Sequence, residues 1–171
     1  MTGPYVTGAT CELLTDEHYG WALRQSVQAS KRRCLCSIFI IDLKTPCAAN
    51  CITDVIDDLA DARWRGVDVR VLVGGSRSTF AIGEAAAIAV AHLTDRGIPS
   101  RWLTSDKAAR GSHAKNVVVD EAVLLGSHNW SPGAFHRDTQ DSVRITSAAL
   151  AEYLAALFEA RWTSDGTDRD G

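Results

Sequence analysis

The sequence predicts an α/β fold in which a mixed β-sheet is flanked by helices. Short apolar runs alternate with amphipathic helical segments through the first hundred residues, and two further apolar runs follow so closely that they must form a hairpin. The expected order is β-α-β-α-β, then the hairpin, a last strand and a C-terminal helix. With 171 residues, 46% of them hydrophobic, the chain can bury one core.

The first half of the chain is expected to alternate helices and strands. A helix over 15–30 carries Tyr19, Leu23 and Val27 at a spacing of four residues, which makes one apolar stripe. The following elements are a strand over 34–41, a helix over 53–66, a strand over 67–73, a helix over 79–96 and a strand over 98–103.

The second half begins with the hairpin, formed by "KNVVVD" and "AVLLGS", and continues with a strand over 142–145. A helix over 147–162 should then pack on the sheet. Residues 1–163 are expected to form one domain, and the polar tail 164–171 is expected to be disordered. The apolar face of the last helix is expected to consist of Leu150, Leu154, Leu157 and Phe158.

Composition limits the function classes. The net charge of −3 and the pI near 5.9 give no overall basic field, so binding to a polyanion requires a local basic cluster. No run of about 18 apolar residues and no secretory leader pattern occurs. We therefore expect a soluble, cytoplasmic protein without membrane contact.

The five cysteines are an odd number in a chain without a leader, which favours reduced thiols over a disulfide framework. A zinc site is the alternative for Cys34, Cys36, Cys47 and Cys51. The first two fall inside an expected strand, and the spacing of the other two does not match a zinc knuckle. Buried thiols are therefore the favoured interpretation.

The hairpin carries a cluster of polar side chains. His113 and Lys115 are two residues apart, so on a strand they project from the same face. The turn brings Ser127 and Asn129 back beside them, whereas Asp120, an odd number of positions from His113, should project from the other face. An imidazole, an ammonium, a hydroxyl and a carboxamide therefore meet at one place.

This combination suits phosphoryl chemistry. Lys115 supplies positive charge, and Ser127 and Asn129 supply neutral donors, for the non-bridging oxygens of a phosphoryl group. Neutral His113 can attack phosphorus or transfer a proton when an acceptor holds its second ring nitrogen, and Asp141 is the candidate acceptor. No carboxylate cluster accompanies the site, so this chemistry requires no metal or other cofactor.

"HAKNVVVD" followed by "GSHNWS" resembles the HxKxxxxD and GSxN motifs of the phospholipase D superfamily. The resemblance implies half of a phospholipase D-like fold and a phosphodiesterase with a covalent phosphohistidine. It implies that His113 is the nucleophile or acid, that Lys115 and Asn129 bind phosphate, and that Asp141 orients the histidine. Asp120 and Gly126 would be structural members of the motif.

The chain departs from the family pattern at three points. Five residues instead of six separate Asp120 from Gly126, Asp141 replaces a glutamate, and only one motif is present. Family members with one motif form homodimers with the site on the twofold axis. We therefore expect a homodimer in which His113 of the partner subunit protonates the leaving oxygen and then activates water.

The candidate catalytic residues do not show whether the substrate is a nucleic acid or a lipid. The loop entering the site is basic, with Lys107 and Arg110, and Arg77 is expected at the same sheet edge. This favours an endonuclease of low sequence specificity on DNA or RNA. The alternatives are a phospholipase or phosphatidyl-transferase, and a catalytically silent nucleic-acid-binding subunit.

Further expectations concern side chains near the site and a partner. His128 and His136 are expected to be hydrogen-bonded or surface residues, and Trp130 a packing residue. A nuclease without sequence specificity would endanger its own cell. We therefore also hypothesise a regulatory partner protein that restrains the activity.

Overall fold

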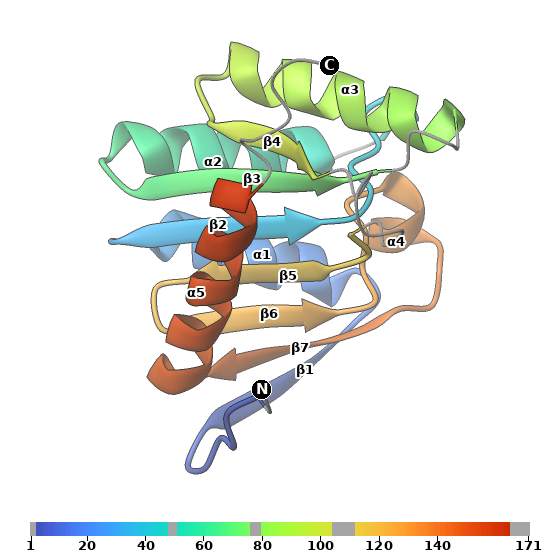
Figure 1. The fold of residues 1–171 in the computed structure, drawn as a ribbon. Coiled ribbons are helices and arrows are strands. Elements are labelled where there is room, and N and C mark those ends of the chain that lie inside the picture. The colour runs from blue at the N-terminus through green and yellow to red at the C-terminus, as the bar shows by residue number, and fades with distance from the viewer. Residues whose placement is uncertain (1–2, 48–50, 76–79, 104–111, 165–171) are drawn as a thin grey trace.

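The computed structural model describes residues 3–47, 51–75, 80–103 and 112–164. Within these residues a mixed seven-stranded sheet carries helices on both faces (Figure 1). This confirms the predicted fold class. The elements are β1 (Thr10–Thr15), α1 (His18–Ala29), β2 (Arg33–Ile38), α2 (Ile52–Trp64), β3 (Asp68–Gly74), α3 (Phe80–Asp95), β4 (Ser100–Leu103), β5 (Lys115–Val119), β6 (Ala122–Gly126), α4 (Pro132–His136), β7 (Asp141–Thr146) and α5 (Ala148–Ser164).

The strand order of the sheet is β1-β7-β6-β5-β2-β3-β4. Strands β2, β3 and β4 are parallel to one another. Strand β5 pairs antiparallel with β2, β6 with β5, β7 with β6, and β1 with β7. The carboxyl ends of β2, β3, β4 and β6 therefore lie at the same edge as the starts of β5 and β7, on the right in Figure 1. We call this edge the site edge.

The larger core lies between the sheet and α1, α2 and α3. Tyr19, Leu23 and Val27 of α1 are each at most 1% exposed and contribute to it, as their fourfold spacing predicts. Alternate residues of the central strands, such as Val71 and Val73 of β3, face the same core. Helices α1, α2 and α3 therefore cover one face of the sheet.

Helix α5 covers part of the other face, and most of the expected stripe packs there, since Phe158 is buried and Leu150 and Leu154 contact the second core. Ala151, Ala155 and Phe158 are buried in a second core, whereas Leu157 is not part of that core. Apolar residues lie on several sides of the helix, so hydrophobic periodicity did not identify Ala151 and Ala155 or exclude Leu157.

Strand β1 and helix α4 were not predicted. β1 is an edge strand whose first four residues are exposed, so it lacks the apolar run typical of a buried strand. α4 is a single short helix capped by Ser131, whose hydroxyl accepts a hydrogen bond from Ala134 N at 3.1 Å, with Pro132 in its first turn. The sequence "SPGA" contains these capping residues and was the signal from which α4 could have been predicted.

The cysteines divide into two groups. Cys34 and Cys36 are buried free thiols in β2, as expected. Cys47 and Cys51 form a disulfide, so the prediction of reduced thiols was wrong for this pair. Their Cα atoms are 5.9 Å apart, a separation that permits a disulfide, and Cys51 stands at the start of α2.

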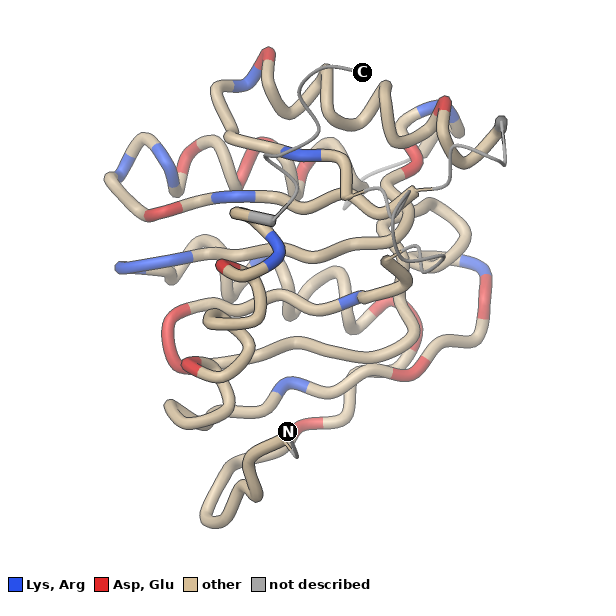
Figure 2. Tube along the Cα trace, in the orientation of Figure 1, with Lys and Arg blue, Asp and Glu red and all other residues tan. Residues whose placement is uncertain are grey.

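Asp120 ties the β5–β6 hairpin to the start of β2. Its carboxylate accepts backbone hydrogen bonds from Lys31, Arg32 and Arg33 at 2.8 to 3.1 Å. Basic residues at the start of β2 therefore lie beside the acidic hairpin turn, at the edge opposite the site edge (Figure 2). Asp120 has a positive φ of 51°, which aspartate tolerates better than most residues, so the short turn needs no glycine.

None of the helices in the described ranges is both long and apolar enough to cross a membrane.

Candidate active site

His113 and Lys115 lie together at the site edge, as strand alternation predicts. His113 is exposed and precedes β5, which begins at Lys115. The Nζ atom of Lys115 lies 3.1 Å from Nδ1 of His113 and also donates to the His113 carbonyl oxygen at 3.1 Å. An ammonium and an imidazole are thus in direct contact.

Phe39, immediately after β2, supports both side chains. Its ring centroid lies 4.3 Å from that of His113, and the Lys115 ammonium lies 5.1 Å from it in cation–π geometry. Sequence reasoning missed Phe39. The available signal was its position at the carboxyl end of a buried strand, where site residues of α/β sheets gather.

Gly74, at the end of β3, makes room for this arrangement. A Cβ atom on Gly74 would lie 2.6 Å from the carbonyl oxygen of Ser112 and 2.8 Å from Cα of Phe39. Only a residue without a side chain allows these two backbone segments to approach the end of β3 so closely. Gly74 therefore contributes to the position of His113.

Lys115 is a cation without a carboxylate partner. Partial burial lowers its pKa, and no acidic side chain in the described part of the chain forms an ion pair with it. The face of Phe39 offsets part of the cost of this burial. An uncompensated ammonium beside an exposed imidazole favours an anionic ligand, because the anion would supply the missing charge.

Ser127 and Asp141 are joined to each other across the β6–β7 ends. Ser127 N donates to the Asp141 carbonyl oxygen at 3.0 Å, Asp141 N donates to the Ser127 hydroxyl at 3.1 Å, and that hydroxyl donates to Gln140. Gly126 permits this approach, since a Cβ there would lie 2.4 Å from Cα of Ser142. The Ser127 hydroxyl is therefore already engaged within the chain.

Asn129 lies between two buried residues, His128 and Trp130. Trp130 N donates to the Ile40 carbonyl oxygen at 3.0 Å, which holds this segment beside the one that follows β2 and begins with Phe39. The Asn129 Oδ1 atom is buried and accepts no hydrogen bond from any described residue. The Asn129 side chain thus has one buried polar atom without a partner among the described residues.

His128 and Trp130 are packing residues, as expected. His128 contacts Ser142 Oγ through Nδ1 at 2.8 Å and the Asp16 carbonyl oxygen through Nε2 at 3.0 Å, and it stacks on Tyr19. Burial lowers the pKa of His128, which favours the neutral ring. Trp130 is fully buried, whereas His136 is exposed in α4.

The two aspartates of the motif lie at opposite edges. Asp141 begins β7 at the site edge, but no hydrogen bond joins its carboxylate to His113, both residues being described. Asp120 follows the far end of β5, so the whole length of the strand separates it from His113. The separation does not come only from the two side chains pointing to opposite faces of the sheet. Its hydrogen bonds are structural, as expected.

The expected basic rim is only partly described. Arg77, Lys107 and Arg110 lie outside the described residues. Arg101 is described, and its guanidinium donates to the Trp162 carbonyl oxygen and lies 4.7 Å from the centroid of that indole ring. Arg101 therefore connects β4 with the end of α5 through a hydrogen bond and a cation–π contact.

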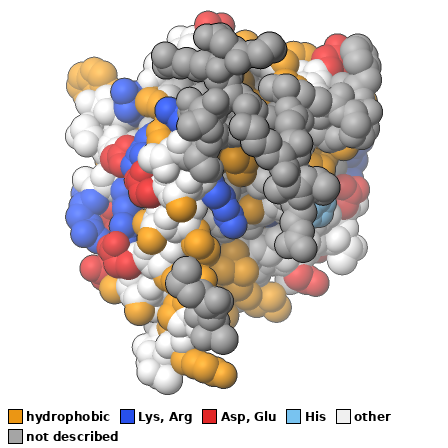
Figure 3. All heavy atoms as spheres, viewed as in Figure 1, with side chains coloured by type: hydrophobic (Ala, Val, Ile, Leu, Met, Phe, Trp, Pro, Cys, Tyr) orange, Lys and Arg blue, Asp and Glu red, His pale blue; other side chains and the backbone are white. Residues whose placement is uncertain are grey.

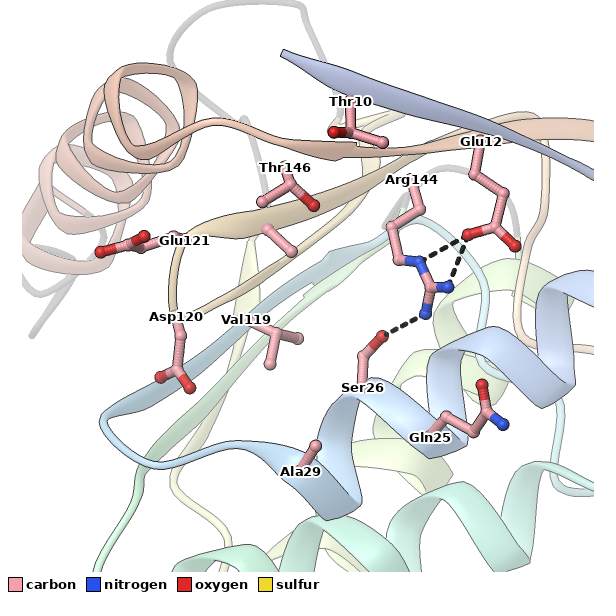
Figure 4. Close-up of a pocket in the computed structure, with 11 residues that line it drawn as sticks. Thr10, Glu12, Gln25, Ser26, Ala29, Val119, Asp120, Glu121, Arg144 and Thr146 are labelled. Atoms are coloured by element: carbon pink, nitrogen blue, oxygen red, sulfur yellow. Dashed lines mark hydrogen bonds and ion pairs between the residues drawn. The ribbon is translucent and has the colours of Figure 1, made fainter.

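A cavity of about 530 Å³ lies away from this site, between α1 and strands β1 and β7 (Figure 4). The Arg144 guanidinium at its wall donates to Glu12 at 2.8 Å and to Ser26 at 3.4 Å. The cation is thus compensated within the chain, unlike Lys115. In the described ranges no group of three or more histidine, cysteine or acidic side chains could bind a metal ion.

The fold and the motif residues define a class of phosphodiesterase-like domains, and the comparisons with known proteins agree. The family model described as "Cardiolipin synthase, PLD-like domain" matches residues 23–162. The chain therefore belongs to the phospholipase D superfamily. No curated protein sequence shows a significant match.

Solved structures share the fold at low sequence identity. Nuc from Salmonella typhimurium, a phospholipase D family member, is 21% identical with a TM-score of 0.72, over 90% of this chain and 94% of that chain. NucT from Helicobacter pylori is 14% identical with a TM-score of 0.73, over 91% and 97%. TrmBL2, an archaeal chromatin protein with a novel mode of DNA binding, is 13% identical with a TM-score of 0.56, over 90% and 52%.

Proposed function

We propose that the chain is a metal-independent phosphodiesterase that cuts DNA or RNA with low sequence preference, at a site shared by two copies. The observation that carries the proposal is the contact of the exposed His113 with Lys115, an ammonium that no described carboxylate neutralises. A nucleophile beside an uncompensated cation suits attack on a phosphodiester, whose non-bridging oxygens carry the negative charge.

The proposed first step forms a phosphohistidine. In the free chain Lys115 points at Nδ1 of His113. A bound phosphate would compete for this ammonium, so Nδ1 could carry the ring proton towards Asp141 and leave Nε2 as the nucleophile. Nε2 attacks phosphorus, and the bond to the leaving oxygen breaks as His113 of the partner subunit gives that oxygen a proton.

The second step hydrolyses the phosphohistidine and restores free His113. The same partner histidine, now neutral, takes a proton from a water molecule as the water oxygen attacks phosphorus. The phosphorus–nitrogen bond breaks, His113 is released, and the product keeps the phosphate. Lys115 and Asn129 would hold the non-bridging oxygens throughout both steps.

Nucleic acid is favoured as substrate by the basic residues of the loop before His113, and TrmBL2 shows that this fold occurs in a DNA-binding protein. A lipid phosphodiester is the second candidate, because the matching family model is that of cardiolipin synthase. Each candidate requires the same chemistry at His113.

Cleavage in EDTA tests the proposal. Single- and double-stranded DNA and RNA should be cut by the wild-type protein in EDTA, and His113→Ala should lower the rate at least about 1,000-fold, because removing a nucleophile leaves only binding contributions. The control is His18→Ala, which removes an exposed histidine outside the cluster and should leave the rate unchanged.

Three results would contradict the proposal. Loss of wild-type cleavage in EDTA would show a need for metal. Hydrolysis of cardiolipin or phosphatidylcholine vesicles with nucleic acid left intact would assign the site to lipid. Nucleic-acid binding without turnover, unchanged in His113→Ala, would indicate a silent binding subunit.

A further inference from the structure

Asp16, in the turn between β1 and α1, is bonded to the residue that precedes β7. Its backbone N donates to the Gln140 carbonyl oxygen at 3.0 Å, and its Oδ1 atom accepts a hydrogen bond from Gln140 N at 2.9 Å. Two segments that are distant in the sequence are thus joined at the site edge, on the right in Figure 1. Both the backbone and the side chain of Asp16 therefore hold the start of β7.

The same aspartate holds the residue before Asn129. His128 is fully buried, and its Nε2 atom lies 3.0 Å from the Asp16 carbonyl oxygen. Because a carbonyl oxygen only accepts, Nε2 carries the ring proton, and Nδ1 accepts from the Ser142 hydroxyl at 2.8 Å. Burial lowers the pKa of His128, which agrees with this neutral form. Each ring nitrogen thus has one partner, and one of these partners is Asp16.

Gln140 extends the connection to Ser127. The Ser127 hydroxyl donates to Oε1 of Gln140 and accepts a hydrogen bond from Asp141 N at 3.1 Å. The hydroxyl proton is therefore directed to Gln140 within the chain. Asp16 thus bonds directly to the residue before Asp141 and, through that residue, reaches Ser127.

Asp16 lies at the surface of the site edge and not in a core. It is half-buried, and charged side chains and a histidine are exposed along this edge, on the right in Figure 3. It lines a hollow of about 140 Å³ together with residues of the α4–β7 connection, among them Arg137 and Asp138. Because Asp16 belongs to neither hydrophobic core, its replacement leaves no cavity in them.

Asp16 has a backbone conformation that few residues adopt. Its φ is 49°, in the left-handed region, which aspartate tolerates better than most residues. Among the described residues Asp120 is the other non-glycine residue with a positive φ, at 51°. Its carboxylate also accepts backbone hydrogen bonds, but at the edge opposite the site edge. The same arrangement thus occurs twice, once beside the candidate site and once far from it.

We propose that Asp16 is a positioning residue of the candidate site. Through His128 it sets the position of Asn129, and through Gln140 it sets the position of Asp141. The inference rests on the proposed function, in which Asn129 holds a non-bridging oxygen and Asp141 takes the ring proton of the nucleophile. A small displacement of such groups lowers the rate strongly, although Asp16 binds no substrate itself.

Two substitutions separate the carboxylate of Asp16 from its backbone conformation. Asp16→Gly keeps the positive φ but removes the acceptor for Gln140 N, whereas Asp16→Asn keeps both. For oligonucleotide cleavage in EDTA, Asp16→Gly should lower kcat at least about 10-fold and change KM less than about threefold, because contacts with the rest of the substrate remain. Asp16→Asn should stay within about threefold of the wild type in both constants.

The matched control is Asp120→Gly. It removes a carboxylate that accepts backbone hydrogen bonds at the same positive φ, but at the opposite edge. It should lower the melting temperature at least as much as Asp16→Gly does, because it removes three such bonds. Its kcat, measured well below its melting temperature, should stay within about threefold of the wild type.

A double-mutant cycle tests whether Asp16 acts through Gln140. Gln140→Ala removes the acceptor of the Ser127 hydroxyl and should itself lower kcat. If Asp16 acts through this side chain, the double variant should be within about twofold of the slower single variant. A double variant slowed by the product of the two single effects would show that the residues act independently.

Amide hydrogen exchange gives a readout that requires no cleavage. The N–H groups of Ser127 and Asp141 are hydrogen-bonded across the β6–β7 ends. Asp16→Gly should speed their exchange at least about 10-fold, whereas the N–H of Val118, in the central strand β5, should change less than about threefold. Asp120→Gly should not give this pattern.

Three outcomes would overturn the inference. Asp16→Gly could keep the kcat of the wild type, or Asp120→Gly could lower kcat as strongly as Asp16→Gly. In the third, the exchange of Ser127 and Asp141 is the same in Asp16→Gly and the wild type. A wild-type chain that does not cut nucleic acid would instead overturn the proposed function, and hydrogen exchange would still decide whether Asp16 holds the two segments.

Discussion

At the scale of single residues, the candidate site includes a side chain outside the family motif. His113 and Lys115 both rest on Phe39, which the sequence motif does not contain. The motif could be recognised from sequence because it lies within one short hairpin. Phe39 could not, because it is distant in sequence and is brought to the site only by the pairing of β2 with β5.

Phe39→Leu should lower kcat about 10- to 100-fold with little change in KM, because a small displacement of a catalytic group lowers the rate that strongly while substrate contacts remain. Phe39→Tyr keeps the ring and should stay within about threefold of the wild type. Steady-state cleavage of a short oligonucleotide measures both constants. Equal rates for Phe39→Leu and wild type would show that Phe39 does not contribute to catalysis.

Asp120 gives a prediction on stability and pH. Partial burial acts to raise its pKa, but the three backbone N–H donors outweigh this effect, so the pKa lies below its ordinary value. A lowered carboxylate pKa stabilises the fold above the unfolded pKa near about 3.9, and this contribution is lost as the pH falls through the folded-state value.

Asp120→Asn should therefore lower the free energy of unfolding by about 1.5 to 3 kcal/mol at pH 7, since the bonds to a charged acceptor are lost while tolerance of positive φ is kept. Urea unfolding across pH measures this difference. It should shrink as the pH drops below about 4. A difference that is constant with pH would show that the charge is not responsible.

At the scale of elements, the sequence predicted what local patterns determine. The β5–β6 hairpin was predicted within one residue at each end, because two apolar runs so close together allow no other connection. β1 was missed because an exposed edge strand has no apolar run. The packing face of α5 was predicted in part, because Phe158, Leu150 and Leu154 pack on the second core as expected. Ala151 and Ala155 were missed, and Leu157 lies outside that core.

Gly74→Ala tests how β3 positions the site. The added Cβ would lie within 3 Å of backbone atoms of Ser112 and Phe39, so one of these segments must shift. We expect cleavage to fall at least about 10-fold while the sheet still folds, because the shift displaces His113. Gly3→Ala, where the new atom meets only ordinary contacts, is the control. Unchanged activity in Gly74→Ala would contradict this role of the glycine.

At the scale of the whole molecule, the sequence predicts a homodimer because it holds one motif, but features that join distant parts of the chain are not visible in it. The single motif in the chain is visible by inspection. The neighbourhood of Leu13, Val143 and Leu125 is not visible, since these residues come from three strands and lie side by side only through the strand register. The disulfide between Cys47 and Cys51 likewise could not be predicted from the spacing of the two cysteines.

Subunit mixing tests a shared site directly. When wild-type protein is equilibrated with a threefold excess of His113→Ala, only wild-type pairs hold two histidines, so activity per wild-type chain should fall to about a quarter. The readout is the initial rate of cleavage at fixed wild-type concentration. A rate that does not respond to the added variant would show that one chain carries a complete site.

The bond between Cys47 and Cys51 has a practical consequence for every such measurement. Both sulfur atoms belong to residues between β2 and the start of α2, so a thiol reductant in the buffer creates a second covalent form of the protein. Samples purified with and without dithiothreitol are therefore different molecular species. Their rates should be compared with each other before either is compared with a mutant.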